Sequence, residues 1–115
     1  MANTFKVVTK AGVTSEDTIY TVAGSTTTVI LGLVLGNTTT SQTTVTVTLS
    51  SNTGSRAGDN DENNQDVELV TNAPIPAGSS LEMLAGNKVV METTDLLKVT
   101  GSGATDVCLS IMEIT

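Results

Sequence analysis

The stretch TTVTVTL at residues 43–49 alternates hydroxylated and apolar side chains with a period of two. In an extended strand, this alternation places Val45, Val47 and Leu49 on one face and the threonines on the opposite face. The stretch therefore predicts a half-buried β-strand, and it carries no chemistry of its own.

The rest of the chain repeats this design, with short runs rich in Val, Ile, Leu and Thr separated by turn residues and without a helical period. We predict further strands at residues 4–9, 16–22, 28–35, 66–70, 79–84, 88–92, 96–100 and 106–114. Turns are predicted between them, two of which are Lys10–Gly12 and Pro74–Gly78. The pattern predicts an all-β fold, either an antiparallel β-sandwich or a jelly-roll-like barrel of about eight or nine short strands. The 115 residues suit a single β domain over residues 1–115.

The predicted strand at residues 28–35 is apolar on both faces. Strict alternation puts four of its side chains on one face and two on the other: Val29, Leu31, Leu33 and Leu35 against Ile30 and Val34. A strand with two dry faces needs a cover on each side, which is the opposing sheet on one side and a loop, a terminus or a neighbouring subunit on the other. The short polar link that follows predicts a β-hairpin with residues 43–49.

The last predicted strand, residues 106–114, is also apolar on both faces for much of its length. Val107, Leu109 and Ile111 are expected on one face, with Cys108 and Met112 on the other. We therefore treat this strand as a second candidate for subunit contacts.

Charge and composition exclude several classes of function. The chain carries 12 acidic and 5 basic residues, a net charge of −7, and has no basic stripe that would attract a phosphate backbone. Its longest apolar run is far shorter than the roughly 20 residues that span a bilayer. Neither a nucleic-acid partner nor a membrane partner is expected. Cys108 is the sole cysteine and no signal peptide is evident at the start, so we expect synthesis in a reducing cytoplasm.

A long polar, acidic loop is predicted at residues 50–65. Within it, Asp59, Asp61 and Asn63 occupy alternate positions, as in the first half of a calcium-binding loop. The pattern then departs from such a loop, because Asn64 stands at the glycine position and Val70 at the bidentate Glu position. The alternative interpretation is a solvated loop that keeps the surface soluble.

The sequence offers no catalytic constellation. It contains no histidine, the usual general acid–base residue, and no Gly-x-Ser-x-Gly nucleophile motif. Cys108 lies in an apolar strand without a histidine partner, so we expect it to be a small core residue and not a nucleophile. A non-enzymatic protein without a cofactor is predicted.

Three segments carry a resemblance to a known class of protein: IYTVAGSTTTVILGL at residues 19–33, APIPAGSSLEMLAGNK at 73–88 and CLSIMEI at 108–114. Together they resemble the small β-rich virion structural proteins of tailed bacteriophages, particularly marine and cyanobacterial phages. The chain departs from the pattern at Val22, where proline is usual, and at Thr94-Asp95, where Gly-Asp is typical.

The resemblance implies a virion protein made in the cytoplasm of the host bacterium, most simply a capsid decoration (cement) protein bound to the major capsid protein as a homo-oligomer, expected to be a trimer. The alternatives are a neck or tail structural protein, or a receptor- or glycan-binding module of a fibre. Subunit contacts are predicted to use the two doubly apolar strands and the first strand, through Phe5, Val29, Ile30, Leu31, Leu33, Val34, Leu35, Cys108 and Met112.

Overall fold

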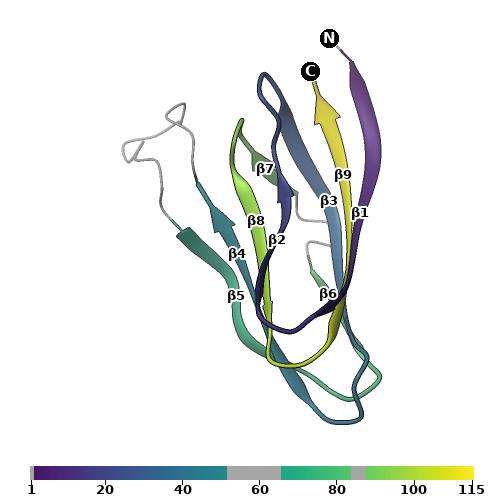
Figure 1. Ribbon diagram of the computed structural model, residues 1–115. Helices are drawn as coiled ribbons and strands as arrows, with labels where there is room; N and C mark the ends of the chain where they lie inside the picture. Colours follow the sequence, from purple (N-terminus) through teal and green to yellow (C-terminus); the bar gives the residue numbers. More distant parts are fainter. Residues whose placement is uncertain (1, 52–65, 84–87) are drawn as a thin grey trace.

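The computed structural model describes residues 2–51, 66–83 and 88–115, and within these ranges the chain forms nine strands in two antiparallel sheets (Figure 1). In the five-stranded sheet, β9 (Thr105–Ile114) lies between β1 (Asn3–Val13) and β3 (Thr27–Asn37). Beyond β3 lie β6 (Ser80–Met83) and β7 (Val89–Met91), which pair with different parts of it. The four-stranded sheet follows the order β2 (Glu16–Thr21), β8 (Leu96–Gly101), β4 (Thr43–Ser50) and β5 (Asp66–Ile75). The predicted all-β fold is confirmed.

The strand order is that of a jelly roll. With β7 set aside, each strand pairs with the strand equally distant from the other end of the chain: β1 with β9, β2 with β8, β3 with β6, and β4 with β5. A chain folded back on itself and rolled into two sheets has this connectivity. It also places the two ends of the chain side by side, where the Thr115 amide donates a hydrogen bond to the Ala2 carbonyl (Figure 1).

One core fills the space between the sheets, and it is built mainly from aliphatic side chains because the chain has only two aromatic residues. Its largest fully buried members come from both sheets: Ile30, Leu33, Leu35, Ile75, Met91, Leu97, Leu109 and Ile111. The alternation in residues 43–49 is confirmed, since Val45 and Val47 are buried and Leu49 packs against the core.

The predicted alternation along residues 28–35 is wrong, because β3 contains a bulge. Between Ile30 and Gly32, β3 advances by two residues while its partner β9 moves by only one, from Ile111 to Ser110. The extra residue shifts the phase, so that Ile30, Leu33 and Leu35 all face the core and Val29 and Val34 face outward. A bulge of this kind leaves no mark in a run of apolar residues.

The predicted hairpin between residues 28–35 and 43–49 is also wrong. β3 and β4 lie in opposite sheets, so the link between them crosses from one sheet to the other. Asn37 holds this crossing in place: its side-chain amide donates to the carbonyls of Ser41 and Ile75, and its carbonyl oxygen accepts from the Thr39 amide. Alternation alone does not reveal which strand pairs with which.

Two predicted turns lie partly within strands. β1 continues through Lys10–Gly12 to Val13, with a register shift on β9 and a positive φ of 67° at Gly12. β5 continues through Pro74 to Ile75, which is possible because β5 is an edge strand of its sheet.

Candidate functional site

The two outer faces of the sandwich differ in chemistry. On the four-stranded sheet, the outward row that runs across all four strands consists of Thr18, Lys98, Thr48 and Glu68. This row is polar, and Thr18 and Glu68 at its two ends are exposed. The outer face of the five-stranded sheet carries exposed large apolar side chains, and it is the candidate functional surface.

Four apolar side chains form one lateral row across the five-stranded sheet. Phe5 on β1 is paired with Met112 on β9, Met112 with Val29 on β3, and Val29 with Val90 on β7. Phe5 is 72% exposed and Val90 is 54% exposed. We call this row the apolar ladder. An exposed apolar row of this length is typical of a surface that another molecule covers.

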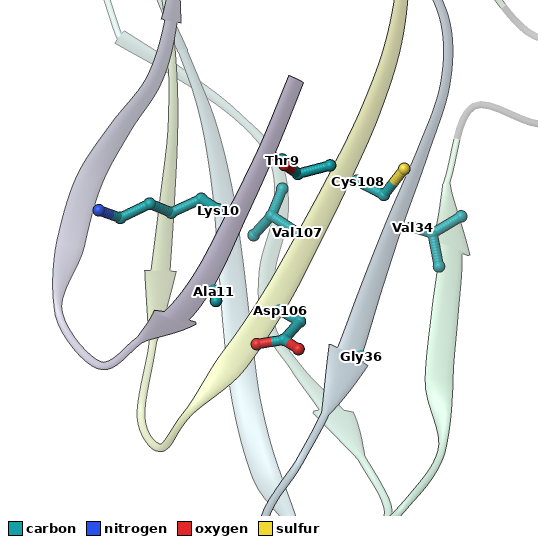
Figure 2. A pocket seen from close by; sticks show the side chains of 8 residues that line it. All are labelled: Thr9, Lys10, Ala11, Val34, Gly36, Asp106, Val107 and Cys108. Atoms are coloured by element: carbon teal, nitrogen blue, oxygen red, sulfur yellow. The ribbon is translucent and has the colours of Figure 1, made fainter. Parts of the chain in front are cut away.

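A hollow lies on the same face, towards the other end of the strands. Its floor is β9, and Thr9 and Ala11 from β1 and Val34 and Gly36 from β3 flank it (Figure 2). The hollow has a volume of about 350 Å³. It forms because Ala11 and Gly36 contribute little or no side chain, so the surface is lower at this end of β1 and β3.

Cys108 lines this hollow and is exposed. The prediction that it is a small core residue is therefore wrong. The inward positions of β9 are Val107, Leu109 and Ile111, as expected, and Cys108 alternates with them onto the outer face.

Five of the predicted interface residues meet on this outer face: Phe5, Val29, Val34, Cys108 and Met112. Leu31 is half-buried at the bulge of β3. Ile30, Leu33 and Leu35 have no exposed surface, so they belong to the core and their assignment to an interface is wrong. The bulge is the reason, because it brings Leu33 and Leu35 onto the same inward face as Ile30.

Sequence reasoning missed two members of the surface. Val7 is 63% exposed and lies between the ladder and the hollow. Its position two residues after Phe5 could have placed it on the same face of the strand as Phe5. Val90 joins the ladder only because β7 pairs with β3, and nothing in the local sequence predicts that pairing.

A hydrogen-bonded group links the two sheets near the ladder. The Tyr20 hydroxyl of β2 donates to Glu113 Oε2 at 2.5 Å and lies 2.8 Å from Thr28 Oγ1. Because a phenol has one proton and donates it to Glu113, the Thr28 hydroxyl donates to the Tyr20 oxygen. Lys6 Nζ contacts Glu113 Oε1 at 2.7 Å.

Burial, followed by the hydrogen bond to Glu113, raises the pKa of Tyr20 to about 12. The hydrogen bond from Lys6, followed by that from Tyr20, lowers the pKa of Glu113. Both shifts keep Glu113 ionised and Tyr20 protonated at neutral pH, so the link between the sheets is stable under ordinary conditions.

The calcium candidates Asp59, Asp61 and Asn63 lie outside the described residues. Among the residues that the structure does describe, no group of three or more His, Cys, Asp or Glu side chains is placed to hold a metal ion. The same residues contain no helix that is long and apolar enough to cross a membrane.

Comparison with known proteins gives no family. No protein-family model matches the chain, and no curated protein matches it. One similar solved structure comes from Bacillus endospore appendages, described as a novel family of disulfide-linked pili, with 16% identity, a TM-score of 0.45 and coverage of 96% of this chain and 85% of that chain. Another comes from the T13 IBDV viral particle, with 10% identity and a TM-score of 0.39; the match covers 96% of this chain and 35% of that chain. Similarity at this level assigns no function.

Proposed function

We propose that this chain is a non-enzymatic structural protein of a phage virion, and specifically a capsid decoration protein that binds the outer surface of a shell built from the major capsid protein. The observation that carries the proposal is the apolar ladder on the outer face of the five-stranded sheet. A protein that works alone in solution gains nothing from Phe5 at 72% exposure and Val90 at 54% exposure in one row. A protein that works by assembly buries such a row when it binds.

The sequence resemblance supports the virion location, and the fold is compatible with it. Jelly rolls build viral capsids, and they also build lectins and cupins, so the fold alone does not select among these functions. The resemblance to phage virion proteins favours a role in the capsid. The protein would then be synthesised in the host bacterium before it is incorporated into the particle.

The proposed mechanism is stabilisation by binding. A rigid domain that binds across contacts between capsid subunits, and not to the separated subunits, shifts the equilibrium towards the intact shell. This needs a surface and a rigid core and no reacting group.

The test is to mix the purified protein with capsids that lack it and to measure the number of copies bound at saturation. The expected result is a copy number fixed by the capsid lattice, together with a higher melting temperature of the shell. Binding confined to the tail vertex would overturn the decoration role and support a neck or tail protein. Binding to a glycan, with a calcium-dependent rise in melting temperature that Asp61→Ala abolishes, would support a fibre module.

A further inference from the structure

We propose that the outer face of the five-stranded sheet binds the same face of a second copy of this chain, with the apolar ladder of each copy over the row of Thr9, Cys108 and Val34 at the edge of the other copy's hollow. The inference rests on the proposed function, because it assigns the ladder to the contact between two decoration subunits; the pair then binds the capsid through surface outside the ladder. It also replaces the three copies that the sequence resemblance suggests with two copies related by a two-fold axis.

The relief of the face is self-complementary. Its central row contains Val7 on β1, Ser110 on β9 and Gly32 on β3. The ladder lies two residues from this row on β1 and β9. The row of Thr9, Cys108 and Val34, at the hollow, lies two residues from it on the opposite side. The ladder, with the large side chains of Phe5 and Met112, and this second row, with the smaller Thr9 and Cys108 on the same strands, are therefore equally distant from the centre.

A two-fold axis along the central row brings the large ladder side chains of β1 and β9 over smaller ones. It places Phe5 over the second copy's Thr9, Met112 over the second copy's Cys108, and Val29 over the second copy's Val34. Each contact occurs twice, as an isologous interface requires. The axis crosses the strands at mid-length, where sheet twist displaces the facing rows least.

The other possible face-to-face axis runs parallel to the strands, along β9. It would set the ladder against the ladder and the hollow against the hollow, which holds the two sheets apart. It would also set Asp106 of one copy against Asp106 of the other, and like charges in contact are unfavourable. The crossing axis avoids both problems.

Charge favours this face over the rest of the surface. Each chain has a net charge of −7, so two copies repel one another unless the contact is uncharged. The ladder and the central row contain no ionisable side chain. Of the acidic residues of this face, Asp106 lies two residues beyond the row of Thr9, Cys108 and Val34. Glu82, paired with Val34, is exposed and ends that row on the edge strand β6, at the rim of the contact, across from the second copy's Val90.

The area is sufficient for a specific contact. Four strand positions about 4.8 Å apart and ten residues at about 3.3 Å each give a face of about 600 Å² per copy. Pairing two such faces buries about 1,200 Å², which is at the lower end of stable, specific interfaces.

Pairing of two copies through the free edge of β1 is the competing geometry, and the lysines of that strand disfavour it. Lys6 and Lys10 turn towards the inside of the sandwich, where they contact Glu113 at 2.7 Å and Asp17 at 3.7 Å. Inward-pointing charges on an edge strand are a common protection against edge-to-edge association. The face is therefore the better contact.

Thiol crosslinking with a short bis-maleimide tests the geometry. In the pairing that we propose, the thiol introduced by Met112→Cys lies about 10 Å from the second copy's Cys108, across the two sheets. The same two thiols in one chain are four residues apart, about 13 Å along β9. We expect Met112→Cys to give a covalent dimer in high yield. Thr46→Cys, on the outer face of the other sheet, also gives the chain two thiols and should give no covalent dimer. A wild-type protein that crosslinks through Cys108 more readily than Met112→Cys would overturn the crossing axis.

Light scattering tests the association itself. The wild-type protein should show a mass twice that of the 11.8 kDa chain at high micromolar concentration. Val7→Glu places two like charges face to face on the axis and should return the mass to that of one chain. Thr18→Glu adds the same charge to the exposed outer face of β2 and should leave the mass doubled. A monomer at every concentration, a trimer, or a dimer that survives Val7→Glu would overturn the inference.

Capsid binding by the same variants separates this inference from the proposed function. A protein that is monomeric throughout and still saturates capsids keeps the proposed function and loses the two-fold pairing. A protein that pairs as described and binds no capsid keeps the pairing and loses the proposed function. Circular dichroism of each variant establishes that it is folded, which the exposure of Val7 and Thr18 leads us to expect.

Discussion

The Tyr20 hydroxyl donates a 2.5 Å hydrogen bond to Glu113 Oε2 and so joins β2 of the four-stranded sheet to β9 of the five-stranded sheet. The two residues are 93 positions apart in the chain. Glu113 is also held by Lys6 from β1, at 2.7 Å. This group fixes the two sheets to one another at the end of the sandwich where the chain begins and ends, next to the ladder.

Tyr20→Phe should lower the free energy of unfolding by about 1–2 kcal/mol, because it removes a hydrogen bond to a charged acceptor and leaves the ring in place. Urea denaturation measures the loss. A double-mutant cycle with Glu113→Ala should show coupling, since both changes remove the same contact. Additive effects of the two substitutions would contradict the direct interaction.

Stability should fall at alkaline pH. Tyrosine ionises near 10.0 in the unfolded chain, and the pKa of Tyr20 in the fold is about 12. Between these values the folded state retains a proton that the unfolded state has lost, so the free energy of unfolding decreases as pH rises. Urea melts at a series of pH values should show this slope in the wild type and a smaller one in Tyr20→Phe. Equal slopes would mean that Tyr20 titrates normally.

Stability should also fall in acid. The pKa of Glu113 is lowered from its ordinary value of 4.5, so the folded state holds fewer protons than the unfolded state just below that pH. The free energy of unfolding therefore decreases as the pH falls below about 4.5 and through the folded pKa. Glu113→Gln should flatten this part of the pH profile, with Glu82→Gln, on the outer face, as the control. A profile unchanged by Glu113→Gln would show that other carboxylates cause the acid loss.

The bulge in β3 predicts that alanine substitutions at two adjacent residues change stability by very different amounts. Leu33 has no exposed surface, so Leu33→Ala should destabilise the protein by about 2–5 kcal/mol through the cavity that it leaves. Val34 is 39% exposed, and Val34→Ala should change stability by about 0.5 kcal/mol or less in a monomeric background such as Val7→Glu. Thermal or urea unfolding compares them. Similar losses at both positions would be inconsistent with the phase of β3 described above.

Gly101 is required by close packing at the end of β8. A Cβ atom there would lie 2.6 Å from the Val13 carbonyl oxygen and 3.0 Å from that of Gly103, both backbone atoms. Gly101→Ala should therefore cost about 1–3 kcal/mol of stability. At Gly32 a Cβ atom would meet nothing within 4 Å in the chain itself, so Gly32→Ala should be nearly neutral in the monomeric background of Val7→Glu. A tolerated Gly101→Ala would mean that β1 and β8 approach less closely at this point.

The sequence by itself determined the class of fold and the positions of the strands. Alternation such as that of Val45 and Val47 depends on two properties that are local: side chains of a strand alternate between faces, and apolar ones avoid water. The same reasoning placed Leu109 and Ile111 on the inner face of β9 and Cys108 on the opposite one. It also selected strands that contribute to the candidate surface.

Only the tertiary structure decided which strands pair and which outer side chains share a row. The bulge that turns Leu33 inward, the crossing of the chain between β3 and β4, and the arrival of Val90 beside Val29 all depend on contacts between distant segments. A single inserted residue in a ladder reverses the faces of every residue beyond it, and no local preference signals it. The apolar ladder is therefore a property of register, visible once β1, β9, β3 and β7 are aligned.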